Sequence, residues 1–195
     1  MIDRQDITAL VLAGGKSRRM GGKDKGLLPF ADETLIGHVV KAILPQVGSV
    51  LISANRNLEE YQRLGFPVIA DPLDDFQGPL AGFLAGLEEM RTEYLLTLPC
   101  DGPFVVANLA QRLAAGLTAA DAEIAVAQDG QRLQPVYALL HRGVVSDLRQ
   151  ALEQGERKID RWYPRNRWVT VDFSDVPAQF SNINTPEDYA SAGRG

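Results

Sequence analysis

Short, uninterrupted apolar runs alternate with amphipathic segments along the first half of the chain. Such runs are typical of strands that are buried on both faces of a parallel sheet. The predicted strands are 7–13, 50–52, 68–70 and 94–98. The predicted helices are 36–43, 58–64, 80–87 and a segment that starts at Pro103 and runs through Leu113. This alternation predicts an α/β fold, a three-layer, Rossmann-like architecture with a mostly parallel open sheet and helices on both faces.

The second half of the chain has a less regular pattern. Strands are expected over 123–127, 135–140 and 168–173, and a helix over 144–152. Thr185 followed by Pro186 has the residue types of a helix N-cap and first turn. Because no linker is visible, we expect a single domain over 1–195.

Polar residues and glycines follow the four strands predicted in the first half. They are Gly14 and Gly15, Ser53 and Asn55, Asp71, and Asp101. In open parallel sheets, ligands bind outside the carboxyl ends of the strands. We therefore expect these groups to converge on one crevice.

The loop predicted over 14–28 is both glycine-rich and basic. It contains Gly14, Gly15, Gly21, Gly22 and Gly26 together with Lys16, Arg18, Arg19, Lys23 and Lys25. Glycines expose backbone N–H groups and allow an anion to approach closely, so the pattern favours phosphate binding. The alternative is a surface loop whose cations are only solvated. Neither a Walker A loop nor a Gly-x-Gly-x-x-Gly fingerprint is present.

Asp101 comes directly after a predicted buried strand that ends in Pro99 and Cys100. A carboxylate at this position suits Mg²⁺, which is held by one or two carboxylates together with substrate phosphates. The alternative is that Asp101 caps the helix expected from Pro103. Asp71 has a similar alternative, an Asp-Pro turn. Cys100 has no partner that would make it a nucleophile, and we expect it to be packed and inert.

Composition narrows the class of partner. The chain has 20 Lys and Arg against 25 Asp and Glu, a formal net charge of −5, which argues against a nucleic-acid-coating protein. The cations of 14–28 instead predict one small polyphosphate held with Mg²⁺. A single cysteine excludes an internal disulfide framework. No apolar run reaches the roughly 20 residues of a membrane helix, and the polar start is unlike a secretion signal, so we expect a cytoplasmic protein.

Residues 12–25, Leu-Ala-Gly-Gly-Lys-Ser-Arg-Arg-Met-Gly-Gly-Lys-Asp-Lys, resemble the glycine-rich motif of sugar-phosphate and cofactor nucleotidyltransferases. Further motifs at 71–72, 78–82, 98–104 and 180–188 resemble the molybdenum cofactor guanylyltransferase family. Together these motifs cover nearly the whole chain. The resemblance implies an enzyme that transfers GMP from Mg·GTP to molybdenum-bound molybdopterin and releases pyrophosphate.

The resemblance also implies roles for individual residues. On the nucleotide side, the backbone of Leu12, Ala13 and Gly14 contacts GTP, Asp71 holds the nucleoside, and Arg19 and Lys25 neutralise phosphates with the loop that includes Gly15 and Gly22. Asp101 binds the nucleotide and Mg²⁺. Related enzymes often have Asn where this chain has Ser53, so Ser53 and Asn55 are alternatives for one contact. Toward the pterin lie Gly82, Gln134, Asn182 and Asn184, with Gly78 in the same motif as Gly82.

Two alternatives to GMP transfer stay open from the sequence. The first is a related nucleotidyltransferase, including one that uses CTP for the same cofactor, because base selection depends on pocket geometry. The second is a nucleotide-binding module without turnover, against which Lys25 and Asp101 speak. The chemistry of an unstable cofactor also implies transient contacts with the proteins that precede and follow the enzyme in its pathway.

Overall fold

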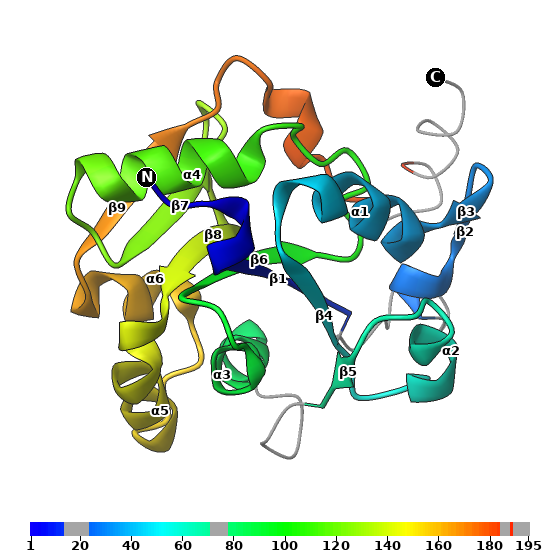
Figure 1. Cartoon of the computed structure of the whole chain (residues 1–195), viewed down its shortest axis with the longest axis horizontal. Coiled ribbons are helices and arrows are strands. Elements are labelled where there is room, and N and C mark those ends of the chain that lie inside the picture. The colour runs from blue at the N-terminus through cyan, green and yellow to red at the C-terminus, as the bar shows by residue number, and fades with distance from the viewer. Residues whose placement is uncertain (14–23, 71–77, 184–187, 189–195) are drawn as a thin grey trace.

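A seven-stranded sheet forms the centre of the computed structural model, which describes residues 1–13, 24–70, 78–183 and 188 (Figure 1). The strand order is β5-β4-β1-β6-β8-β7-β9. Its strands are β1 (Ile7–Leu12), β4 (Ser49–Ser53), β5 (Val68–Ile69), β6 (Tyr94–Pro99), β7 (Ile124–Gln128), β8 (Leu133–His141) and β9 (Trp168–Asp172). β8 is antiparallel to β6 and β7, and the other pairs are parallel. The predicted mostly parallel sheet is confirmed.

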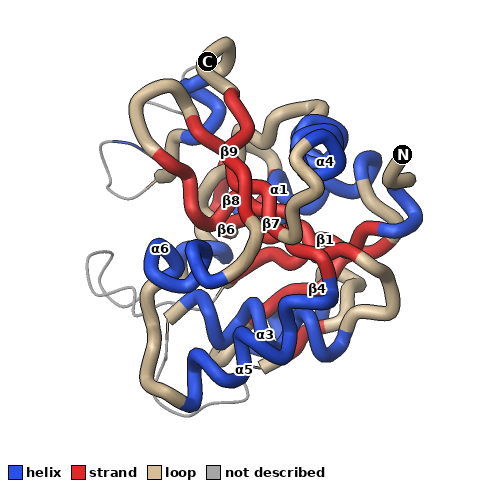
Figure 2. Tube along the Cα trace, turned by 90° about the vertical axis from the view of Figure 1, so that its left-hand side faces the viewer, coloured by secondary structure: helices blue, strands red, loops and turns tan. Residues whose placement is uncertain are grey.

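Helices cover both faces of the sheet, as predicted (Figure 2). They are α1 (Leu35–Ile43), α2 (Leu58–Gln62), α3 (Pro79–Glu89), α4 (Leu109–Ala119), α5 (Val145–Glu153) and α6 (Ile159–Trp162). Ile7, Ala9 and Val11 pack on the face of α1 and α4, whereas Leu10 packs with α3 and α5. Because side chains of a strand alternate between its faces, β1 contributes to both layers of the core.

The helix expected from Pro103 is wrong at its start, because α4 begins only at Leu109. Gln46, from the turn after α1, fixes this boundary. Its Nε2 donates to the carbonyl of Val106 at 2.9 Å, and its Oε1 accepts from the N–H of Ala110 at 3.1 Å. Gln46 thus holds residue 106 outside the helix and supplies a partner for an N–H of the first helical turn, which has none within the helix.

Other differences from the predicted elements are local. The last part of the loop predicted over 14–28 forms a 3₁₀ turn (Lys25–Leu27), and a small hairpin of β2 (Pro29–Phe30) and β3 (Glu33–Thr34) follows it; the pattern predicts none of these elements. The short helix α6 was also not predicted. The helix expected after Thr185 lies outside the described residues. In the part of the chain that is described, no helix has the length and apolar character needed to cross a membrane.

Candidate nucleotide-binding site

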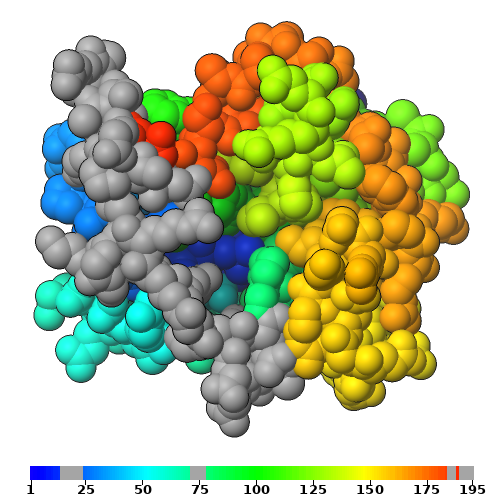
Figure 3. Space-filling model, turned by 180° about the vertical axis from the view of Figure 1, so that it is seen from behind, coloured from blue at the N-terminus to red at the C-terminus, as the bar shows by residue number. Residues whose placement is uncertain are grey.

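The carboxyl ends of β1, β4 and β6 lie side by side at one edge of the sheet. The N–H of Ala13 donates to the carbonyl of Ser53 at 2.8 Å, and the N–H of Cys100 donates to the carbonyl of Leu12 at 3.1 Å. These bonds place Leu12, Ala13, Ser53 and Asp101 around the same edge, as the rule for parallel sheets predicts. Figure 3 shows a hollow on this side of the molecule, with the end of β1 at its floor and the start of α3 beside it.

Lys25 and Asp101 meet at this edge. Lys25 Nζ lies 3.5 Å from Asp101 Oδ2, and the two side chains are 21% and 16% exposed. The residues are 76 positions apart in the sequence, so only the fold brings them together. A lysine and a carboxylate at one site can hold a polyphosphate and a divalent cation, respectively.

The segment around Lys25 is fixed by its neighbours. Asp24 accepts hydrogen bonds from the hydroxyl of Tyr61 at 2.5 Å and from the amide of Asn57 at 3.1 Å. Gly26 lies between α2 and the end of β6. A Cβ on this residue would be 2.8 Å from Tyr61 Oη, on α2, and 3.3 Å from Cys100 Sγ, directly after β6. Asp24 is therefore used to anchor the loop on α2, which holds Lys25 beside Asp101.

Burial and charge act in opposite directions on Asp101. Burial raises the pKa of this carboxyl above its ordinary value, and the Lys25 ammonium beside it opposes that rise. The neighbouring thiol of Cys100 is buried, and burial raises its pKa as well. A protonated, enclosed thiol is a poor nucleophile, in agreement with the packed and inert cysteine that the sequence predicts.

Asp101 does not cap a helix. Seven residues lie between it and Leu109, the first residue of α4, and the N-cap of that helix is Asn108, so that alternative is wrong. Its carbonyl instead accepts a hydrogen bond from the N–H of Ile183 at 2.8 Å. This bond brings the exposed residue Asn182 next to the turn that carries Asp101. One predicted acceptor-side residue therefore lies beside the Lys25–Asp101 pair.

The glycines of the 78–82 motif lie at and within the start of α3. Gly78 has φ 83° and ψ −178°, a combination that only glycine adopts readily, and Pro79 follows at the first helical position. Gly82 is buried in the first turns of the helix. A Cβ at Gly78 would lie 3.4 Å from the carbonyl oxygen of Arg157, so the start of α3 lies against the segment that precedes α6.

The remaining predicted residues fall into two groups. Asn55 is half-buried beyond the end of β4, and Gln134 is buried with its amide nitrogen 2.6 Å from Asp129 Oδ2. The structure says nothing of the others, which lie outside the described residues: Gly14, Gly15, Arg19, Gly22, Asp71 and Asn184. Within the described ranges, no group of three or more His, Cys, Asp or Glu side chains is placed to hold a metal ion.

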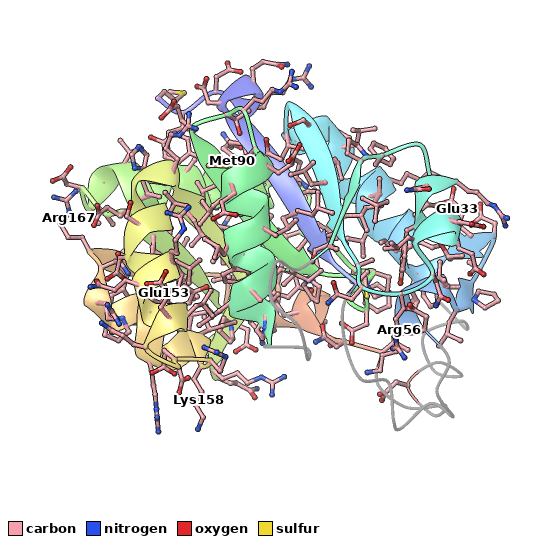
Figure 4. All side chains as sticks on the ribbon, turned by 90° about the horizontal axis from the view of Figure 1, so that it is seen from below. Glu33, Arg56, Met90, Glu153, Lys158 and Arg167 are labelled. Atoms are coloured by element: carbon pink, nitrogen blue, oxygen red, sulfur yellow. The ribbon has the colours of Figure 1, made fainter. Side chains whose placement is uncertain are left out.

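Sequence reasoning missed several residues of this edge. Exposed Arg56 follows the end of β4 and exposed Lys158 precedes α6, and Figure 4 shows both at the end of the molecule opposite Met90, the residue after α3. They add positive charge on either side of the start of α3. Arg56 follows Asn55 directly, so its position after a strand was a usable signal. Nothing in the sequence pattern signalled Tyr137, whose hydroxyl abuts Gly102.

An open sheet with a cation and a carboxylate at the carboxyl ends of its parallel strands is typical of α/β proteins that bind a ligand at those ends, and the class to which this one belongs is that of the NTP transferases. The chain matches the MobA-like NTP transferase domain over residues 9–168 and belongs to that family.

Its relatives carry a more specific name. The chain is 47% identical over 181 residues to the molybdenum cofactor guanylyltransferase of Shewanella loihica, covering 93% of this chain and 92% of the relative. It is 48% identical over 194 residues to the protein of the same name from Ralstonia nicotianae, covering 95% of each. The solved structure of molybdopterin-guanine dinucleotide biosynthesis protein A from Archaeoglobus fulgidus has a TM-score of 0.78 at 23% identity, covering 95% of this chain and 96% of that one, and supports the fold.

Proposed function

We propose that this chain transfers GMP from GTP to the terminal phosphate of molybdenum-bound molybdopterin, forming the guanine dinucleotide cofactor and pyrophosphate. The observation that carries the proposal is the Lys25–Asp101 pair at the carboxyl ends of β1 and β6. The family match and the shared name of the relatives select the guanylyl transfer among the reactions that such a site can support.

The reaction requires no protein nucleophile. An oxygen of the acceptor phosphate forms a bond to the α-phosphorus of GTP, and the bond from that phosphorus to the bridging oxygen breaks as pyrophosphate leaves. Because the attacking phosphate is already anionic, no general base is needed to activate it. The protein must instead hold two strongly negative groups together and stabilise the charge of the transition state.

In this proposal Lys25 and Arg19 neutralise phosphate charge, and the backbone of residues 12–15 and Gly22 shapes the phosphate site. Asp101 is the proposed ligand of Mg²⁺, which would supply Lewis-acid stabilisation of phosphate charge at this position. One largely buried carboxylate fits this ion, because Mg²⁺ typically takes one or two protein carboxylates and completes its shell with phosphates and waters.

The N-terminal half is proposed to bind GTP and the C-terminal half to bind the acceptor, within one domain. Asp71 and either Ser53 or Asn55 contact the nucleoside, whereas the acceptor lies toward Gly82, Gln134, Asn182 and Asn184, with Gly78 in the same motif as Gly82. The product is passed on through transient contacts with other proteins of cofactor synthesis. The proposed location is the cytoplasm, because a single free thiol is compatible with a reducing compartment.

Pyrophosphate release with a nucleotide panel tests the proposal. The purified protein is supplied with Mg²⁺, molybdenum-loaded molybdopterin and each of GTP, CTP, ATP and UTP in turn. Release that needs both GTP and the acceptor supports GMP transfer. Release with CTP instead would make the chain a cytidylyltransferase, and GTP binding without any release would make it a binding module.

A further inference from the structure

The hydroxyl group of Tyr137 takes no part in the hydrogen bonds that hold the described part of the fold together. The residue lies on β8 and is 2% exposed. Its hydroxyl oxygen is buried and has no hydrogen-bond partner among the residues that the structure describes. A buried hydroxyl without a partner costs stability, so phenylalanine would be the more stable residue if packing were the only requirement.

The hydroxyl abuts the turn that carries Asp101. A Cβ built on Gly102 would lie 2.1 Å from Tyr137 Oη, 3.4 Å from Tyr137 Cζ and 3.2 Å from Asn182 Oδ1. The phenol oxygen therefore occupies the space that any side chain at residue 102 would need. Gly102 follows Asp101 directly, so the backbone next to the proposed metal ligand rests against this oxygen.

Neither the Tyr137 ring nor the turn at Gly102 can move away easily, because each is held by other contacts. The ring of Tyr137 packs edge-on against Phe180, with ring centroids 5.0 Å apart and planes at 83°. On the other side, the hydrogen bond from the N–H of Ile183 ties down the carbonyl of Asp101. Close-packed interiors transmit such a displacement rather than absorb it. A change in volume at either residue should thus move the Asp101 turn.

We propose that Tyr137 is a positioning residue that acts through Gly102 and fixes where the Asp101 carboxylate stands relative to Lys25. The inference rests on the proposed function, which makes Asp101 the ligand of the metal and nucleotide. It adds that the phenol oxygen of Tyr137 fills the space that a side chain at residue 102 would occupy. Substitution at either position shifts the carboxylate without changing the residue that binds.

A double-mutant cycle of Gly102→Ala and Tyr137→Phe tests this match. Gly102→Ala places a methyl group on the phenol oxygen, and kcat/KM for Mg·GTP is expected to fall about 100-fold, as for a displacement near 1 Å. Tyr137→Phe is expected to melt no lower than wild type, because it removes the unpartnered hydroxyl, yet to require more Mg²⁺ for half-maximal rate. In the double variant the Phe ring leaves room for the methyl group, and kcat/KM should recover roughly tenfold or more over Gly102→Ala.

Gly116→Ala is a matched steric control. A Cβ there would lie 2.4 Å from Val171 Cγ2, in the contact between α4 and β9 and not in the Asp101 turn. This variant is expected to melt at a lower temperature but to keep the wild-type Mg²⁺ requirement when it is assayed below its melting range.

Calorimetric titration with Mg·GTP separates failure of this inference from failure of the proposed function. If the wild-type protein binds no Mg·GTP, the proposed function fails. If it binds and the two substitutions simply add their losses, or Gly102→Ala behaves as wild type, the positioning role is overturned. Should Gly102→Ala be too unstable to purify, Tyr137→Phe alone decides, because an unchanged Mg²⁺ requirement contradicts the proposal.

Discussion

Replacement of Lys25 by alanine should abolish most turnover while leaving the fold nearly intact. The Lys25–Asp101 pair joins two largely buried groups at 3.5 Å, with side chains 21% and 16% exposed. An exposed pair contributes at most about 1 kcal/mol to the free energy of unfolding, whereas removal of one partner of a fully buried pair costs about 3–5 kcal/mol. Because burial already raises the pKa of Asp101, this carboxyl can take up a proton when Lys25 is absent, and we expect a cost of about 1–3 kcal/mol. In a chain of this length 1 kcal/mol corresponds to about 2–4 °C, so the melting temperature of Lys25→Ala should fall by about 2–12 °C while the protein stays folded at assay temperature.

The expected loss of turnover is much larger. A cation that faces charge developing in the transition state is worth about 10²–10³ in kcat, because it acts in a site that excludes much of the water. Steady-state pyrophosphate release and thermal melting of the same preparation measure the two effects together.

Lys41→Ala is the control for Lys25→Ala. Lys41 Nζ, on α1, lies 3.4 Å from Glu33 Oε1, on β3, in an ion pair that is more exposed than the Lys25–Asp101 pair. Both rate and melting temperature should stay close to wild type. A loss of less than about tenfold in kcat for Lys25→Ala, against the 10²–10³ expected, would refute the role given to this lysine. A rate that fell only in proportion to unfolded protein would refute it as well.

Three further outcomes are expected. Asp101→Asn should raise the Mg²⁺ concentration needed for half-maximal rate, and identical metal titrations would contradict its role as a ligand. Burial raises the pKa of Asp129, but hydrogen bonds from two backbone N–H groups and the Gln134 amide outweigh it and leave the pKa below its ordinary value. In urea unfolding at pH 7, wild type should therefore have a larger free energy of unfolding than Asp129→Asn. This difference should shrink as the pH falls below about 4, since a carboxylate with a lowered pKa loses its contribution to stability in acid. Cys100 should react with Ellman's reagent only after unfolding, because its side chain is enclosed; rapid labelling of the native protein would show that the end of β6 opens.

The central strands were predictable because each is a short apolar run buried on both faces, and its periodicity needs no knowledge of distant residues. That the ends of β1, β4 and β6 lie together was predictable from a second rule, because the carboxyl ends of neighbouring parallel strands lie at the same side of a sheet. The start of α4 was not predictable in this way. Pro103 is a good first helical residue, but the side chain of Gln46, more than fifty positions earlier, sets the boundary at Leu109.

The candidate site was likewise only partly predictable from the sequence. Lys25 and Asp101 were singled out from local motifs, yet their contact depends on Tyr61 and Cys100, which pack around Gly26. Tyr137 lies on a strand whose apolar pattern marks it as core. Its proposed role depends on the position of its hydroxyl beside Gly102, a relation between residues 35 positions apart that no spacing rule expresses.

Transfer of a labelled nucleotide tests the central claim most directly. The protein is incubated with Mg²⁺, molybdenum-loaded molybdopterin and GTP labelled with ³²P at either the α- or the γ-phosphate. The account predicts that the α-label appears in the dinucleotide cofactor and the γ-label in pyrophosphate, and that both need the acceptor. Label from the γ-position in the cofactor, or pyrophosphate formed equally well without the acceptor, would contradict GMP transfer.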